Sequence, residues 1–144
     1  MIYLDTSFLL PLFRQEATSN RVSAYLGKLP VSSLYISHWT RVEFASVIAR
    51  EVRMQAITNA QGKILIDSFD DFIHESLHLI VPNAADFNLA QSFVKNFSTK
   101  LRGPDALHLA VVSNHSMDEM LSLDADLLLA AKMLKIAAQR GIRG

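Results

Sequence analysis

Short β-type runs alternate with longer segments of helical periodicity, and this alternation is the feature that most constrains the fold. The expected strands are residues 2–4, 35–37, 77–81 and 119–123. Apolar residues recur at spacings of three and four over residues 39–54, 60–75, 86–97, 106–112 and 127–134, which predicts helices there. Strands that alternate with helices favour parallel pairing and right-handed crossovers. We therefore expect an α/β fold, a three-layer sandwich around a central, mostly parallel twisted sheet of four to five strands.

The length of 144 residues, half of them hydrophobic, predicts one globular domain that covers residues 1–144. Lys and Arg together number 14, as do Asp and Glu, so the net charge is zero. Any attraction for nucleic acid must therefore come from a local patch of cations. The chain has no cysteine, which excludes disulfides, thiolate metal sites and cysteine nucleophiles. This composition fits a reducing compartment, and we expect a cytoplasmic protein.

The opening residues MIYLDTSFLLPLF are apolar but make a poor signal peptide, because they lack a basic start and contain Asp5. No stretch of the sequence is long enough to span a membrane, so we expect no membrane partner.

Residues His74 to His78 read HESLH and match the H-E-x-x-H pattern of zinc proteases. That chemistry needs His74 and His78 on one face of a continuous helix, with a third ligand downstream. The alternation of Leu77, Leu79 and Val81 instead favours a strand, and the extended motif is absent. We therefore expect a solvated helix end followed by a strand, without a zinc site.

Four dispersed carboxylates form the more informative pattern. Asp5 follows the first expected strand and Asp124 follows the Leu121–Leu123 run, so both belong at the carboxyl edge of a parallel sheet, where ligands bind. Glu43 and Asp105 lie in the first turns of two expected helices that start at the same edge. Clustered carboxylates repel one another unless a cation neutralises them. An all-oxygen cluster suits Mg²⁺ or Mn²⁺.

Each of these residues also has a plainer interpretation. Asp5, Asp105 and Asp124 are suited to helix N-caps, and Asp126 can share the last of these roles. No Lys or Arg lies three or four positions from Glu43, so a helical ion pair does not account for that residue. His108 is expected to be a hydrogen-bonded packing residue on an apolar helix.

The segments MIYLDTSFLL, TRVEFASVI, LRGPDALHLAVV and LSLDADLLLAA, in this order, resemble the four acidic motifs of PIN-domain ribonucleases. The chain is most similar in pattern to VapC-like toxins of type II toxin–antitoxin systems. The resemblance implies that Asp5, Glu43, Asp105 and Asp124 are the catalytic, metal-binding tetrad. The supporting residues would be Thr6, Ser7, Ser122 and Asp126. After Leu134 the family often has a glycine and a last apolar strand, whereas this chain reads KIAAQRG from Lys135 to Gly141, which leaves the fifth strand open.

This resemblance implies an Mg²⁺- or Mn²⁺-dependent endoribonuclease that hydrolyses RNA phosphodiester bonds, with a small antitoxin protein as partner and a homodimeric state. Arg14, Lys100 and Arg102 are the candidate RNA-binding cations. The segments 9–13 and 44–48 offer either a groove for a partner helix or ordinary core. The alternative function is a catalytically inert PIN-like module that binds RNA or protein. A phosphatase with Asp5 as nucleophile is disfavoured, because Ser7 stands where a second acid is needed.

Overall fold

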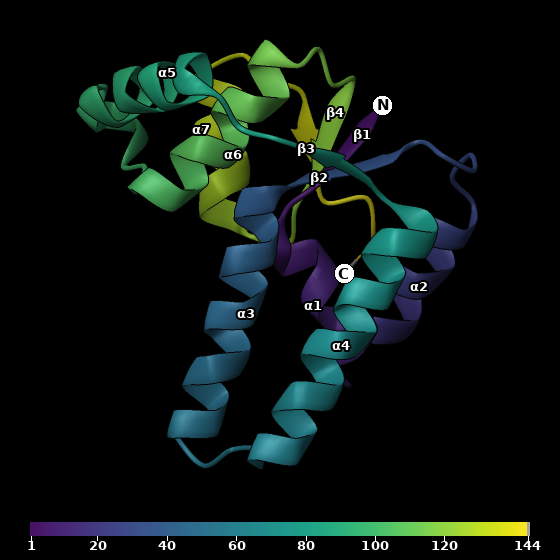
Figure 1. Cartoon of the computed structure of the whole chain (residues 1–144). Helices are drawn as coiled ribbons and strands as arrows, with labels where there is room; N and C mark the ends of the chain where they lie inside the picture. The colour runs from purple at the N-terminus through teal and green to yellow at the C-terminus, as the bar shows by residue number, and fades with distance from the viewer. Residues whose placement is uncertain (144) are drawn as a thin grey trace.

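A parallel sheet of five strands forms the middle layer of the molecule, in the order β3-β2-β1-β4-β5 (Figure 1). The structure is a computed structural model that describes residues 1–143. The strands are β1 Ile2–Leu4, β2 Leu34–Ser37, β3 His78–Ile80, β4 Glu119–Leu121 and β5 Ala138–Gln139. All neighbouring strands pair in parallel, and Tyr3 in the central strand lies opposite Tyr35 on one side and Met120 on the other. The predicted fold class is confirmed.

The fifth strand, left open by the sequence, does form at the edge beside β4. Lys135 ends the preceding helix with φ of 59°, a left-handed conformation that glycine adopts more readily. Its backbone N–H donates to the Lys132 carbonyl, which turns the chain back towards the sheet. Leu121 can then pair with Gln139. The turn expected of a glycine is therefore made by a lysine.

Helices cover both faces of the sheet (Figure 1). They are α1 Thr6–Phe13, α2 Ser19–Gly27, α3 His38–Arg53, α4 Asn59–Ser76, α5 Ala84–Lys95, the short 3-10 helix η1 Phe97–Thr99, α6 Gly103–Asn114 and α7 Ala125–Met133. Of the longer helices, α1 was expected from the N-cap residue Asp5, and α3 to α7 were predicted from their periodicity, whereas α2 was not predicted. The short apolar stripe of α2, formed by Val22, Tyr25 and Leu26, covers little more than one turn and was not recognised in the sequence.

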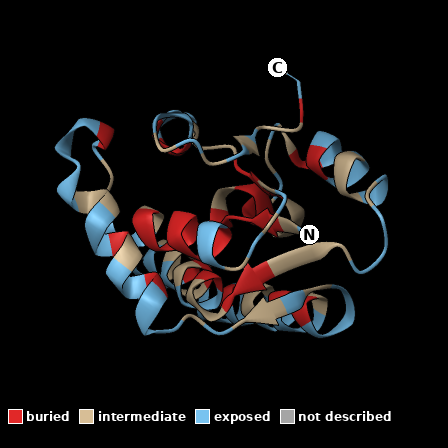
Figure 2. Cartoon of the chain, turned by 90° about the horizontal axis from the view of Figure 1, so that it is seen from above, coloured by how far each residue is buried: buried red, intermediate tan, exposed pale blue. Residues whose placement is uncertain are grey.

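Successive residues of β1 explain the three layers, because neighbouring side chains on a strand point to opposite faces. Leu4 packs with Phe8, Phe44 and other side chains of α1–α4. Tyr3 packs on the opposite face with Leu109 of α6 and Leu127 of α7. Viewed from above, the buried segments lie at the centre of the molecule, with exposed ones around them (Figure 2).

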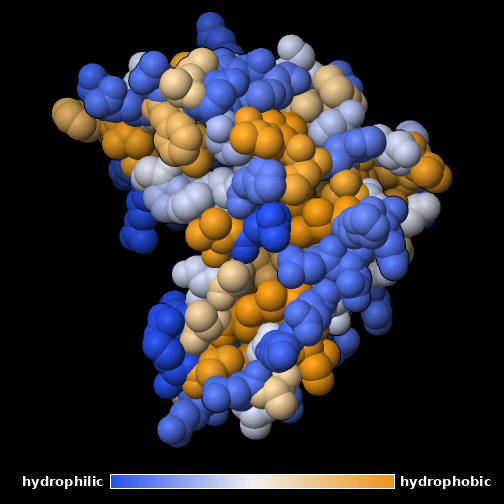
Figure 3. All heavy atoms as spheres, viewed as in Figure 1, coloured by the Kyte–Doolittle hydropathy of each residue, from blue (hydrophilic) through white to orange (hydrophobic). Residues whose placement is uncertain are grey.

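The helices α3 and α4 form a long antiparallel pair that projects from the sheet (Figure 1). Phe44 stacks on Phe69 at a centroid distance of 4.1 Å, and Phe13 meets both rings edge-on. Apolar atoms are visible along the seam between the two helices (Figure 3). Val42 belongs to the apolar periodicity of segment 39–54 but is 56% exposed, because the buried face of α3 runs through Thr40, Phe44 and Ile48.

The suggested partner groove at segments 9–13 and 44–48 is not free for docking. Leu9, Phe44 and Ile48 are fully buried and belong to the main apolar cluster. The plainer interpretation, ordinary core, is the correct one. Within residues 1–143, none of the helices has the length and apolar character needed to cross a membrane.

Candidate active site

Asp5 and Asp124 lie at the carboxyl ends of adjacent strands, as predicted. Asp5 directly follows β1 and accepts a hydrogen bond from the Phe8 N–H, which makes it the N-cap of α1. Asp124 follows β4 and caps α7 by accepting from the backbone N–H groups of Asp126 and Leu127. The capping interpretation is thus confirmed for both residues. Because the two strands are paired, capping also brings the two carboxylates to one edge of the sheet.

Two serine hydroxyls hold the Asp5 carboxylate. Ser7 donates to Oδ1 at 2.7 Å and Ser122 donates to Oδ2 at 2.9 Å. Asp5 is only 4% exposed, and burial raises its pKa to about 6 although His108 and these hydrogen bonds oppose the shift. The same hydroxyls accept from the chain leading to α7, since Ser7 receives the Leu123 N–H and Ser122 receives the Asp124 N–H. Ser7 and Ser122 therefore fix two candidate ligands at once.

Glu43 reaches the site from the second turn of α3. Its Oε1 accepts a hydrogen bond from the Thr6 hydroxyl at 2.8 Å and is also hydrogen-bonded to His108 Nε2. Its ionic partner therefore comes from α6, far away in sequence, which explains why no local ion pair was found. Thr6 is thereby placed beside the acids, as expected from its position after Asp5.

His108 is a buried, hydrogen-bonded residue, as predicted, but it also touches the acid cluster. Its Nδ1 lies 2.6 Å from the Tyr3 hydroxyl, which in turn lies 3.0 Å from Ser37 Oγ. Burial alone lowers the pKa of this imidazole, yet the neighbouring Tyr3 and Glu43 raise it to about 10. No sequence pattern indicated the contribution of Tyr3, because an apolar strand position ordinarily faces the core.

Asp105 and Asp124 line one crevice of about 630 Å³, together with Asp126 and the cations Lys100 and Arg102. Asp105 occupies the first turn of α6 rather than its N-cap, which is Arg102. Burial raises the pKa of Asp105, and the negative charges of Asp124 and Glu43 raise it further. Asp105 thus lies within electrostatic range of Asp124 and Glu43, and Asp5 is linked to Asp124 through the Ser122 hydroxyl.

The third candidate cation, Arg14, lies elsewhere. It follows α1 at the end remote from Asp5, where it forms ion pairs with Glu51 of α3 and, at 3.4 Å, with Glu16. Lys100 and Arg102 are thus brought to the acidic crevice, whereas Arg14 is engaged in an ion pair outside it.

The oxygen donors of this cluster match the chemistry of Mg²⁺ or Mn²⁺. In the arrangement that residues 1–143 adopt, no three carboxylate or imidazole groups are positioned to hold one ion together. Asp5 and Glu43 are held by hydroxyl or imidazole hydrogen bonds, while the Asp105 side chain has no hydrogen bond recorded among these residues. Joint ligation would therefore require side-chain rotation, mainly by Asp105.

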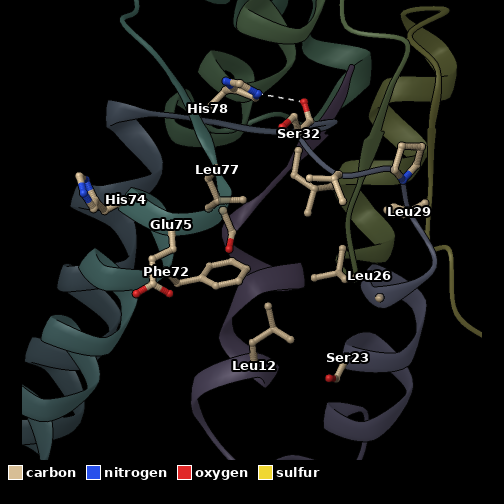
Figure 4. Close-up of a pocket in the computed structure, with 15 residues that line it drawn as sticks. Leu12, Ser23, Leu26, Leu29, Ser32, Phe72, His74, Glu75, Leu77 and His78 are labelled. Atoms are coloured by element: carbon tan, nitrogen blue, oxygen red, sulfur yellow. Dashed lines mark hydrogen bonds between the residues drawn. The ribbon is translucent and has the colours of Figure 1, made fainter.

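The H-E-x-x-H motif does not form a zinc site. Helix α4 ends at Ser76, and His78 already belongs to β3, where it hydrogen-bonds the Ser32 carbonyl at 2.9 Å and stacks on Tyr35. His74 and His78 lie apart on the wall of a separate pocket of about 660 Å³ (Figure 4). The predicted helix end and strand start are confirmed.

Several solved structures share this fold. VapC20 from Mycobacterium tuberculosis, described as a Sarcin-Ricin loop cleaving toxin, has a TM-score of 0.73 at 16% identity, covering 90% of this chain and 95% of that one. FitAcB from Neisseria gonorrhoeae has a TM-score of 0.70 at 20% identity and covers 98% of each chain. FitAB bound to an IR36 DNA fragment has a TM-score of 0.69 at 20% identity, covering 96% of this chain and 94% of that one. At these identities the similarity shows the fold alone.

A search among curated proteins finds no significant match. The sequence itself matches the PIN domain family over residues 2–133, a span that includes all four acids and nearly the whole sheet. PIN domains are usually nucleases. Because the family match covers most of the chain, this protein belongs to the PIN-domain family.

Proposed function

We propose that this protein is an Mg²⁺- or Mn²⁺-dependent endoribonuclease that acts as the toxin of a toxin–antitoxin pair. One observation carries the proposal. Asp105 lies close enough to Asp124 and Glu43 for their charges to raise its pKa, at the sheet edge where Asp5 is already held. Such mutual repulsion is unfavourable in the apo protein and is relieved when a cation binds. The usual nuclease activity of PIN domains supports the same conclusion.

The residues that would hold the metal are Asp5, Asp105, Asp124 and Glu43. A divalent ion bound there supplies an activated water and neutralises the charge that develops on the phosphodiester. The hydroxyls of Ser7 and Ser122 keep Asp5 in place, while Thr6 and His108 hold Glu43. Asp126, exposed on the first turn of α7, lines the same crevice and adds a further negative charge to it.

Lys100 and Arg102 are the residues proposed to bind the RNA backbone. Both line the crevice beside Asp105, and both are exposed, so phosphates can reach them without desolvating a buried cation. Arg14 contributes less to binding under this proposal, because Glu51 and Glu16 already neutralise it.

A nuclease of cellular RNA must be restrained in its own host, and we propose a small cognate antitoxin that does so. An arginine from the partner can pair with the acids of the crevice and displace the metal. One solved structure of this fold is described as a Sarcin-Ricin loop cleaving toxin, which supports the toxin assignment. We also propose a homodimer, by resemblance to the family.

The test is cleavage of a structured RNA by the purified chain with Mg²⁺ or Mn²⁺, compared with single-stranded DNA and p-nitrophenyl phosphate. We expect cleavage of RNA only, and its loss on addition of EDTA. Asp105→Asn should lower the rate by about 100-fold or more, the scale on which loss of one group that stabilises transition-state charge is measured. Asp67→Asn, an exposed change on α4, is the matched control. RNA binding without cleavage would support the inert module instead.

A further inference from the structure

An apolar groove lies along α5, beside the acidic crevice but separate from it. It has a volume of about 430 Å³. Its main lining residues come from three helices: Trp39 of α3, Phe87, Ala90 and Val94 of α5, and Pro104 and Leu107 of α6. Ala90 and Leu107 are nearly buried and form the floor, while Phe87 is 57% exposed. A half-exposed phenylalanine beside such a hollow indicates a surface that is built to be covered.

The groove is joined to the acid cluster through the chain itself. Pro104 directly precedes Asp105, and Trp39 lies one helical turn before Glu43 on α3. The indole N–H of Trp39 donates to the Pro104 carbonyl at 3.2 Å. This bond ties the start of α3 to the start of α6 and satisfies the only polar atom of the ring. Trp39 can therefore offer only its apolar ring surface to a ligand.

The charges near the groove are divided in a way that suits a nucleotide. The residues that line the groove carry no charged side chain, whereas Lys100 and Arg102 line the crevice around Asp105. A phosphodiester at the acids thus has cations beside it, and the apolar groove begins at Pro104, the residue next to Asp105. Unpaired bases are bound in proteins by stacking on aromatic rings next to a cationic path for the backbone.

We propose that this groove binds an unpaired nucleobase next to the cleaved phosphodiester, with Trp39 as the stacking ring and Phe87 at the far end. The inference rests on the proposed ribonuclease function and extends it to the substrate: the RNA must present a single-stranded nucleotide at the cleavage site. Trp39 is then a substrate-binding residue that fixes the position of the chain to be cut, and it takes no part in the chemical step.

The test uses the fluorescence of Trp39, which is the single tryptophan of the chain. A short single-stranded oligoribonucleotide is titrated into the purified protein in EDTA, so that it binds without being cleaved. The same titration is made with an abasic oligonucleotide of equal charge. We expect the normal RNA to quench the emission by stacking, and the abasic one to bind more weakly with little quenching.

Variants separate stacking from a structural role of the same residues. Trp39→Leu should weaken binding of the normal oligonucleotide about 10-fold, measured by anisotropy of a labelled strand, and should leave binding of the abasic strand unchanged. Trp39→Phe, which keeps an aromatic ring, should restore most of the affinity. Phe87→Leu should show a smaller loss of the same kind. Ile64→Ala removes an equally exposed apolar side chain from α4 and should change neither affinity.

Four results would overturn the inference. Equal affinity and equal quenching for normal and abasic strands would show that bases do not reach the groove. Trp39→Leu or Phe87→Leu turning a dimer into a monomer in sedimentation, with RNA affinity unchanged, would show that the groove is covered by a second copy. Absence of any RNA binding or cleavage by the wild-type chain would defeat the proposed function as well, whereas cleavage that is insensitive to Trp39 defeats only this inference.

Discussion

Two buried aspartates in this protein have pKa values shifted in opposite directions. Asp5 is 4% exposed, and burial raises its pKa to about 6. Asp86 is fully buried, yet its pKa is lowered, because hydrogen bonds from His115, Asn83 and Asn114 outweigh the desolvation that acts against them. Asp5 has serine hydroxyls as donors, and its imidazole neighbour His108 is hydrogen-bonded to Glu43 instead.

The difference lies in how deeply each carboxylate is buried and in whether the protein supplies a compensating partner. Asp86 caps α5 through Asn83 and joins α5 to the end of α6 through Asn114 at 2.9 Å and His115 at 2.9 Å. Its negative charge is therefore balanced by hydrogen-bond donors within the fold. Asp5 and Asp105 keep raised pKa values although His108 lies near both and Arg102 near Asp105, so a bound cation would be stabilised there. A buried carboxylate therefore indicates function most clearly where its neighbours do not offset the cost of its burial.

The largest effect is expected from removing the charge of Asp5, the less compensated of the two aspartates. Asp5→Asn keeps the shape of the side chain: Ser7 can still donate to the amide oxygen, and Ser122 can rotate to accept from the amide N–H. We expect RNA cleavage to fall by about 100-fold or more, with no loss of thermal stability, since a desolvated charge has been removed. Cleavage rates and Tm from the same preparations measure this. A variant with full activity would remove Asp5 from the catalytic set.

The reverse outcome is expected for Asp86→Asn. This change removes the charge that His115 and Asn114 bind, so the free energy of unfolding should fall by about 1–3 kcal/mol. Cleavage by the remaining folded protein should stay within about twofold, because Asp86 lies at the opposite end of α6 from Asp105. Urea unfolding followed by circular dichroism gives the stability. Unchanged stability would mean that His115 and Asn114 do not compensate the burial of the Asp86 carboxylate.

The pH dependence of stability sharpens the same contrast. The pKa of Asp86 is lower in the folded than in the unfolded protein, so its contribution is present above the unfolded value of about 4 and is lost as the pH falls through the folded value. The stability difference between wild type and Asp86→Asn should therefore be constant near neutral pH and shrink below about pH 4. Urea midpoints measured from pH 3 to pH 7 check this, and a difference that grows towards low pH would contradict it.

Sequence patterns predicted the site residues whose local role, as the residue after a strand and the cap of a helix, also places them at the sheet edge. Asp5 and Asp124 could be placed because each follows a short apolar strand and caps the next helix, and parallel strands bring such positions together. The contact between Glu43 and His108 could not be predicted, because it joins residues 65 positions apart through tertiary packing. The strand β5 was open for a similar reason. Lys135 adopts the left-handed conformation of the turn before β5, so the family pattern, which often has a glycine there, does not match.

The smallest effect is expected for the H-E-x-x-H residues, which the structure places in a different region from the acids. Replacing His74 and His78 together by Gln should change RNA cleavage by less than about twofold, because neither imidazole contacts a carboxylate of the crevice. The exposed side chain of His74 should contribute nothing measurable to stability. His78 loses its bond to the Ser32 carbonyl and its stacking on Tyr35, so Tm should fall by a few degrees at most. Loss of activity in a folded double variant that added Zn²⁺ does not restore would show an unforeseen link between this pocket and the crevice. Restoration of the wild type by Zn²⁺ after EDTA, but not of the variant, would bring back the zinc interpretation.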